Sequence, residues 1–447
     1  MGKRMIRRIT AIGGDALVGT SGRLLLLVVL VGVASGFAAA VFVSVLHLLT
    51  EVLGPEEWSP VTHVLVLGGV GLGIGLITLV LGNPGDVELL VNNIHVSGGR
   101  SDIRDLRSLL PVSLLGIAAG SAIGPEAPLV QTTGSIGSWV ALRLRLGRQD
   151  MRLLTISGMA AGFTVLLGVP LGSAVFALEI LHRRGLEYYE ALLPAIIGSL
   201  VGYGVYLGIT GVGLEPVFVF PAVGELRPSD LLLGAALGAA GAGLAGLFTY
   251  NAKLLRKLAR RLPVAARPVA GGLALGSLGL LTPLALTFGE HQINEVVAAE
   301  MAVSTLVLAG FAKLFAASMM VTAGWRGGFI IPLFFVGVTL GSALAETFSL
   351  NPVVTITALM AATTVGVTKT PLGSTLVVSE MAGLVVLPTT LLASVVALLL
   401  TSRVGMIDTQ RRREGEVGPQ AESQAETGVA EAFLRPHGGD RLAKEPP

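Results

Sequence analysis

The sequence predicts an all-α membrane protein of two inverted halves, made of many short, tilted and broken helices. Its 447 residues are 52% hydrophobic and only 13% charged, whereas a typical soluble domain is about 25% charged. Sixty glycines and 22 prolines run through the apolar stretches, which is typical of membrane helices that are interrupted and packed closely. An internal repeat divides the chain into the two halves.

Apolar runs predict where the chain crosses the membrane. A spanning helix needs about 20 apolar residues. Runs of that order occur at 24–49, 64–81, 192–207, 231–248, 303–321, 329–344 and 384–400. Basic residues flank several of them, and an excess of Lys and Arg marks the cytoplasmic side. We therefore expect a multi-pass protein of the cell membrane with both termini in the cytoplasm.

These runs also set the expected organisation of the chain. We expect a basic cytoplasmic N-terminus at 1–20, a first membrane repeat at 21–210, a second membrane repeat at 211–407 and a disordered cytoplasmic tail at 408–447. The tail is rich in Glu, Gln, Arg and Gly, and such a composition cannot bury enough apolar surface to fold.

Short motifs recur along the chain at a nearly constant spacing. The repeated blocks are Pro-Leu-Gly-Ser at 170–173 and 371–374, the acids Glu179 and Glu380, Met-Ala-Ala at 159–161 and 360–362, and Gly-x-x-x-Pro-Leu at 124–129 and 328–333. The first three blocks share one offset (371 − 170 = 201), and the last is offset by 204. If each half crosses the membrane an odd number of times, the second half is inverted, and a substrate site forms where broken helices of both halves meet.

Glu126 is the acid in the segment Gly-Pro-Glu-Ala-Pro-Leu-Val at 124–130. A carboxylate inside a membrane is costly and usually functional. The glycine and prolines around it predict that one helix ends here and another runs from about Ala127 to Val140. The free N–H groups at such a helix start form a site for an anion, which the tethered carboxylate can occupy when no free anion does. The counterpart of Glu126 in the second half is Ile330.

Three segments resemble the CLC family of chloride channels and chloride/proton antiporters, and the resemblance covers about 20–407. Residues 124–131 resemble the family's Gly-Arg-Glu-Gly-Pro-x-Val-Gln segment, with Pro125 and Ala127 as departures. Residues 327–332, Gly-Gly-Phe-Ile-Ile-Pro, resemble its Gly-x-Phe-x-Pro segment, with Ile330 in the usual Phe position. Residues 83–88, Asn-Pro-Gly-Asp-Val-Glu, stand where the family has Gly-Ser-Gly-Ile-Pro-Glu.

The resemblance implies a CLC-type inverted repeat, a role for Glu126 as the gate, and chloride or a similar small anion as the substrate. Its carboxylate would compete with the anion and swing away, or be protonated, to let the anion pass. The positions implied in anion binding are Pro84, Gly85, Gly124, Pro125, Ala127, Gly328, Phe329, Ile330, Ile331 and Ile407. The resemblance also implies a homodimer in the lipid bilayer, with its interface on helices near 170–207 and 371–400.

Three departures from the family pattern bear on mechanism. Pro84 replaces the serine whose hydroxyl holds the central ion, and Ile407 or its neighbours replace the tyrosine that holds it from the other side. In coupled members an inward-facing glutamate directly follows the position of Glu179, and that place is Ile180, which cannot carry a proton. We therefore favour passive or weakly proton-coupled conduction, with a chloride/proton antiporter as the alternative.

Other function classes find little support. Cysteine is absent, the six histidines form no ligand-spaced cluster, and a net charge of +2 is too small to suggest nucleic acid, so we expect no metal, no cofactor and no nucleic-acid partner. An intramembrane enzyme would need a nucleophile and base motif that is missing. An unrelated inverted-repeat carrier for an organic or cationic solute is disfavoured because paired carboxylates are scarce.

The remaining charged residues are expected to serve structure. Glu179 and Glu380, near the ends of repeated helices, predict capping or an interhelical hydrogen bond rather than proton transport. Lys313 is expected to snorkel at a helix end, and Lys369 to face the cytoplasmic vestibule. His47, inside the first apolar run, is expected to be a packed, hydrogen-bonded core histidine.

Overall fold

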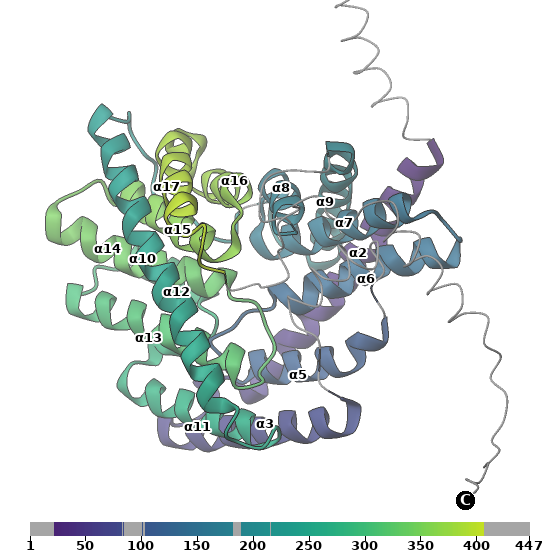
Figure 1. The fold of residues 1–447 in the computed structure, drawn as a ribbon, viewed down its shortest axis with the longest axis horizontal. Coiled ribbons are helices and arrows are strands. Elements are labelled where there is room, and N and C mark those ends of the chain that lie inside the picture. Colours follow the sequence, from purple (N-terminus) through teal and green to yellow (C-terminus); the bar gives the residue numbers. More distant parts are fainter. Residues whose placement is uncertain are drawn as a thin grey trace, which may run out of the picture. The chain divides into compact units, whose positions relative to one another are not determined.

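The computed structural model describes residues 22–82, 84, 101, 103–181, 189–214 and 216–405, and these residues are almost all helical (Figure 1). The helices of the first half are α2 (Gly22–Leu53), η1 (Pro55–Glu57), α3 (Pro60–Leu81), η2 (Ile103–Asp105), α5 (Leu106–Ala118), α6 (Glu126–Arg143), α7 (Arg148–Leu167), α8 (Pro170–Glu179) and α9 (Tyr189–Thr210). The predicted N-terminus at 1–20 and tail at 408–447 lie outside the described residues.

The second half repeats this order of long and short helices. Its helices are α10 (Pro228–Ala259), α11 (Ala266–Leu281), η3 (Pro283–Ala285), α12 (Glu290–Ala298), α13 (Val303–Thr322), α14 (Ile330–Phe348), α15 (Pro352–Thr368), α16 (Pro371–Ala382), η4 (Leu384–Val386) and α17 (Leu387–Leu400). Four of them, α10, η3, α15 and α16, begin at a proline, because the N–H that proline lacks would have no intrahelical partner at the first position.

Equivalent helices of the two halves make equivalent contacts. Helix α6 packs on α7 as α14 packs on α15, α2 packs on α9 as α10 packs on α17, and α3 packs on α11 across the halves. The starts of α6 and α14, at 126 and 330, have the 204-residue spacing of the sequence repeat. The predicted internal repeat is therefore present in the three-dimensional contacts, and the all-α fold is confirmed.

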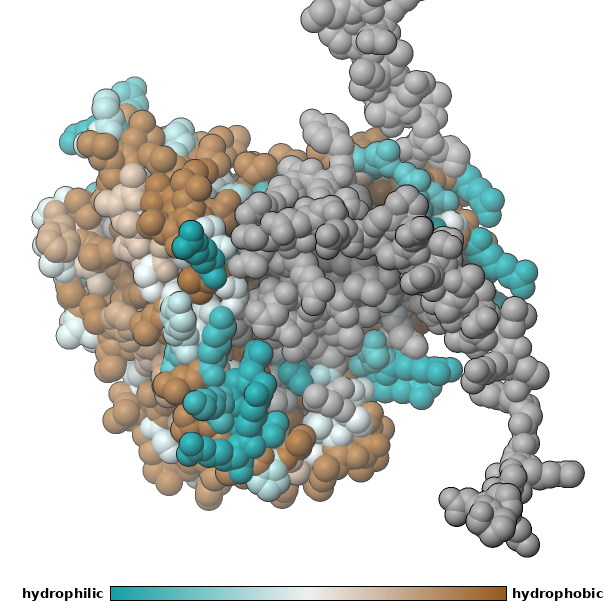
Figure 2. Space-filling model, in the orientation of Figure 1, coloured by the Kyte–Doolittle hydropathy of each residue, from teal (hydrophilic) through white to brown (hydrophobic). Residues whose placement is uncertain are grey.

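Seven helices in the described part are long and apolar enough to cross a membrane: α2, α3, α7, α9, α10, α13 and α14. Apolar residues cover most of the described face in Figure 2, as a lipid environment requires. The apolar runs did not predict α7, because three charged residues, Arg148, Asp150 and Arg152, lie among its first five. The predicted apolar run at 384–400 is not one helix: the structure has a short 3₁₀ turn, η4, followed by α17.

Helices α8 and α16 hold the two halves together through a reciprocal pair of carboxylates. Glu179 at the end of α8 accepts a 2.6 Å hydrogen bond from the Gly373 amide at the start of α16. Glu380 on α16 accepts one of 2.6 Å from the Gly172 amide at the start of α8. Each acid lies near the free N–H groups of the other helix, so the two helices run antiparallel. The interhelical hydrogen bond predicted for both acids is confirmed.

Glycine lets these two helices approach at backbone distance. A Cβ at Gly373 would lie 2.5 Å from the Phe176 Cα, and a Cβ at Gly172 would lie 2.6 Å from the Val377 amide nitrogen. Neither contact can relax by moving a side chain, because the opposing atoms belong to the backbone. The repeated Pro-Leu-Gly-Ser motif therefore encodes the contact between the halves.

Lys369 differs from its expected place in a vestibule. It ends α15 in the left-handed conformation (φ 63°), where the first repeat has Gly168 at the end of α7. Its buried Nζ donates to the Gly366 carbonyl, at 2.5 Å, and to the carbonyl and hydroxyl of Thr401, at 2.8 and 2.7 Å. The lysine thus satisfies carbonyls at the C-terminal ends of α15 and α17, where a positive charge is favourable.

Replacing Gly373 by alanine tests the contact between α8 and α16. We expect Gly373→Ala to lower the free energy of unfolding by about 1–3 kcal/mol, because the added methyl meets backbone. The matched control is Gly243→Ala on α10, where a Cβ meets nothing within 4 Å and removal of a helical glycine is neutral or stabilising. Thermal unfolding in detergent measures both, and equal melting temperatures for the two variants would contradict the assignment.

Candidate functional site

Two helix starts from opposite halves meet at one short backbone bridge. Gly124 and Gly328 form an isolated antiparallel bridge, in which the Gly124 amide donates to the Gly328 carbonyl at 2.8 Å and the Gly328 amide to the Gly124 carbonyl at 2.6 Å. Helix α6 begins two residues after Gly124, and α14 begins two residues after Gly328. The bridge therefore places the N-termini of both helices side by side, with their unpaired N–H groups at one spot.

The carboxylate of Glu126 occupies this spot. Its side chain is 1% exposed, and Oε1 accepts a 2.6 Å hydrogen bond from the Ile331 amide in the first turn of α14. The backbone amides of Glu126 and Ile330 also stabilise the negative charge of the carboxylate. The acid of one half is thus held by the helix start of the other half, where helix dipoles favour negative charge.

The two bridge glycines make room for the carboxylate. A Cβ at Gly124 would lie 2.2 Å from Glu126 Oε2, and a Cβ at Gly328 would lie 2.4 Å from the same atom. Oε2 is buried and has no hydrogen-bond partner among the described residues. Any residue other than glycine at either position would displace the carboxylate.

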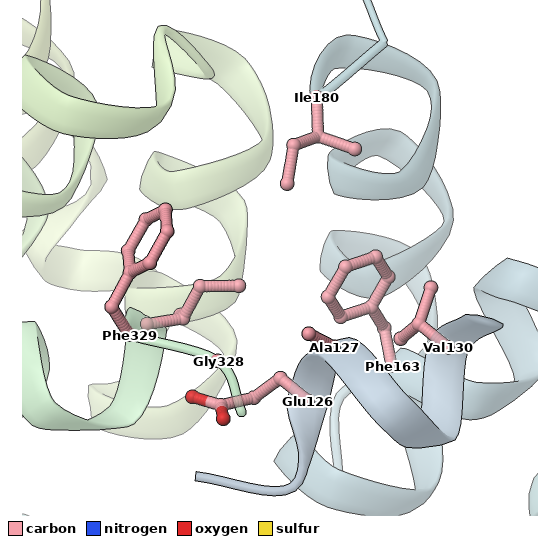
Figure 3. Close-up of a pocket in the computed structure, with 8 residues that line it drawn as sticks. Glu126, Ala127, Val130, Phe163, Ile180, Gly328 and Phe329 are labelled. Carbon is pink, nitrogen blue, oxygen red and sulfur yellow. The ribbon is translucent and has the colours of Figure 1, made fainter. Parts of the chain in front are cut away.

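A cavity of about 330 Å³, including the space open to solvent, adjoins the carboxylate. Its lining is almost wholly apolar and consists of Glu126, Ala127, Val130, Phe163, Ile180, Gly328, Phe329 and Ile330. Figure 3 shows Glu126 at one end and Ile180, from the end of α8, at the other. Ile180, the apolar residue that directly follows Glu179, therefore lies across the cavity from the acid.

The structure brings most of the sequence-predicted residues together. Glu126 and its neighbours in both motifs gather at the bridge or line the cavity: Gly124, Pro125, Ala127, Gly328, Phe329, Ile330 and Ile331. Pro84 is buried, whereas Gly85 and Ile407 lie outside the described residues. Val130 and Phe163 also line the cavity but were not predicted, because nothing in their local sequence sets them apart from core residues.

Lys313 is not a snorkelling side chain. It is fully buried, and its Nζ donates to the carbonyls of Leu286 and Thr287 at 2.5 and 2.7 Å and to Gln292 Oε1 at 3.0 Å. The same atom lies 4.7 Å from the ring centroid of Phe335, a favourable place for a cation. The contacts come from residues distant in sequence, so the local pattern could not predict them.

The described residues contain no group of three or more His, Cys, Asp or Glu placed to hold a metal ion. What the site offers is a set of amide donors at two helix starts and one acid beside an apolar cavity. Such a set can bind a small anion without the full charge of a lysine or arginine, and a site of moderate strength also allows release.

Sequence comparisons with known proteins point to one family. The voltage gated chloride channel family model matches residues 85–402. A "Chloride/fluoride channel protein" of Pseudomonas syringae pv. tomato is 28% identical over 408 residues, which are 86% of this chain and 85% of that protein.

Two solved structures share the fold. A CLC-type fluoride/proton antiporter superposes with a TM-score of 0.78 at 23% identity and covers 87% of this chain and 98% of its own. A slow cyanobacterial Cl⁻/H⁺ antiporter superposes with a TM-score of 0.74 at 21% identity and covers 92% of this chain and 99% of its own. The long and short helices of the two halves are therefore those of an established transporter fold.

Gly124→Ala tests whether the bridge glycines hold the carboxylate in place. In the wild-type background the added methyl should expel the carboxylate and cost about 1.5–3 kcal/mol of stability, the value of a hydrogen bond to a charged group. In a Glu126→Ala background the same substitution should cost much less, because the atoms that it meets are gone. Thermal unfolding of the four proteins gives the coupling, and strictly additive effects would contradict the geometry.

Proposed function

The chain belongs to the voltage-gated chloride channel family, whose members transport anions as channels or antiporters, and we propose that Glu126 gates its pathway for chloride or a similar small anion. One observation carries the proposal. The Glu126 carboxylate accepts the Ile331 amide hydrogen at 2.6 Å, so it fills the place where a free anion would find the helix N-terminal N–H groups.

Gating then follows from competition for the same donors. The bound carboxylate and a free anion both carry negative charge and both need the N–H groups of the two helix starts, so they cannot occupy the spot together. The side chain opens the pathway when an anion displaces it or when a proton neutralises it. The bridge glycines keep the backbone fixed while the side chain moves.

The cavity beside Glu126 favours channel-like or weakly proton-coupled conduction. Val130, Phe163 and Ile180 give it an apolar lining, and an isoleucine side chain cannot accept or release a proton. Glu179, the acid next to Ile180, is engaged with the Gly373 amide of α16. Among the described residues, a proton moving inward from Glu126 would therefore meet no further acid in the cavity lining.

Proton-coupled exchange is the second candidate function. The two solved structures that share the fold are those of a fluoride/proton antiporter and a Cl⁻/H⁺ antiporter. Protons can also cross an apolar cavity along transient water when no acid lines it. For the anion itself, the name of the Pseudomonas relative supports chloride and fluoride as the first two substrates to compare.

Assembly and orientation are part of the same proposal. The homodimer interface would lie on α8, α9, α16 and α17, whose large apolar side chains face outward at Leu193, Leu200, Ile209, Leu372, Val395 and Leu399. The end of α10 carries Lys253, Arg256 and Lys257, and this positive charge supports a cytoplasmic side there. With that orientation, the protein would cross the cell membrane several times and have both termini in the cytoplasm.

Neutralising Glu126 tests the gate. We expect Glu126→Ala to bind chloride at least about tenfold more tightly, because the anion no longer competes with a hydrogen-bonded carboxylate. Chloride efflux from liposomes should also lose its dependence on pH in Glu126→Ala and Glu126→Gln. Glu51→Gln, an exposed acid on α2, is the matched control and should behave as wild type. Unchanged affinity and an unchanged pH profile in both Glu126 variants would refute the gate.

Reversal potentials separate the two candidate functions. For passive conduction, the reversal potential of the reconstituted protein should follow the anion gradient alone and stay fixed when a pH gradient is imposed. Coupled exchange would instead shift it with the pH gradient, by an amount set by the stoichiometry. Repeating the measurement with fluoride in place of chloride compares the two substrates on the same preparation.

A further inference from the structure

The segment 286–292, which ends in the first turn of α12, is fixed close to the gate by contacts with several elements. The Thr287 amide donates to the Gly120 carbonyl at 2.7 Å, and Gly120 belongs to the loop that leads into Glu126. On the other side, Lys313 of α13 binds the carbonyls of Leu286 and Thr287. The start of α12 is therefore anchored to the loop before α6.

Helix α14 provides a further anchor. Gly289, in the left-handed conformation (φ 99°), lies against Phe335 so closely that a Cβ on it would be 3.1 Å from the Phe335 Cβ. Phe335 is one helical turn after Ile331, whose amide holds Glu126. Glu290, the first residue of α12, therefore lies near the same stretch of α14 as Glu126, and its charge acts on the Glu126 carboxylate.

Other titratable groups face Glu290 from neighbouring elements. His291 on α12 and His47 on α2 interact with its charge, as does Tyr206 on α9. Lys313 on α13 binds the adjoining backbone, while α14 contributes the apolar Phe335. Burial raises the pKa of Glu290, and the two histidines partly offset this rise.

Exposure differs along this group of residues. Glu126 is buried, Glu290 is partly exposed, and His291 and His47 are exposed. The expectation that His47 is a packed core histidine is therefore wrong, because its helix position faces outward near α12. The four residues thus range from the buried Glu126, through the partly exposed Glu290, to two histidines at the surface.

We propose that Glu290 and Glu126 form a coupled pair of acids in which Glu290 sets the pH at which the Glu126 gate is released. This inference rests on the proposed gating function of Glu126. A negative charge on Glu290 repels the Glu126 carboxylate and favours its protonated form, so the gate opens at a higher pH than an isolated acid would allow. Because both groups titrate, the transition belongs to the pair and is broadened.

Removing the charge of Glu290 tests the inference. In Glu290→Gln and Glu290→Ala, the midpoint of the pH dependence of chloride efflux should move down by about 1 pH unit, and the transition should sharpen. Glu290→Asp keeps the charge and should stay close to wild type. Glu295→Gln, an exposed acid on the same helix, makes the same change in net charge and should leave the midpoint in place.

Two further proteins distinguish the failure of this inference from the failure of the gate. Glu126→Gln and the double variant Glu126→Gln, Glu290→Gln should share one pH-independent efflux rate. If both neutral Glu290 variants keep the wild-type midpoint while Glu126→Gln abolishes pH dependence, the gate stands and the coupling of the acids is overturned. If Glu126→Gln retains the wild-type pH dependence, the proposed gate itself fails.

Discussion

A carboxylate buried among apolar helices must be compensated, and in this protein the compensation is the hydrogen bond between Glu126 and the Ile331 amide. An uncompensated charge in such surroundings would cost many kcal/mol. The bond requires α14 to begin close to α6, which the bridge between Gly124 and Gly328 ensures. It also requires two positions without a Cβ. The hydrogen bond between Glu126 and Ile331 thereby explains why a glycine stands on each side of the bridge.

The rest of the fold keeps these two helix starts in register. Each half supplies one start, so any sliding of one half against the other would pull the donor from the acceptor. Helices α8 and α16 resist such sliding, since each offers its amide groups to the carboxylate of the other. The contact between α8 and α16 also positions Ile180, at the end of α8, in the wall of the cavity. Two consecutive residues therefore differ in what they contact: Glu179 binds the start of α16, and Ile180 lines the cavity.

Local chemistry explains why much of the site could be predicted from the sequence. Glycine and proline around Glu126 mark a helix start, and the repeated blocks identify the partner segment at Gly328 in the other half. The sequence also shows directly that residue 180 is an isoleucine, which cannot carry a proton. The positions of Lys313, His47 and Glu290 could not, because they depend on how α13, α2 and α12 pack in the fold, and neither periodicity nor a local motif encodes that packing. Helix α7 was not predicted for a related reason: its charged and exposed first turn interrupts the apolar pattern, while tertiary contacts bury the rest of the helix.

The proposed gate requires that the Glu126 carboxylate occupies an anion site made by two helix N-termini. Crystals of Glu126→Gln grown in bromide can show this site, because bromide is located by its anomalous scattering. We expect a bromide ion within hydrogen-bond distance of the Ile331 amide, at the place that the carboxylate holds in the wild-type protein. An anomalous map with no bromide at the two helix starts, in crystals that hold the ion elsewhere in the pathway, would contradict it.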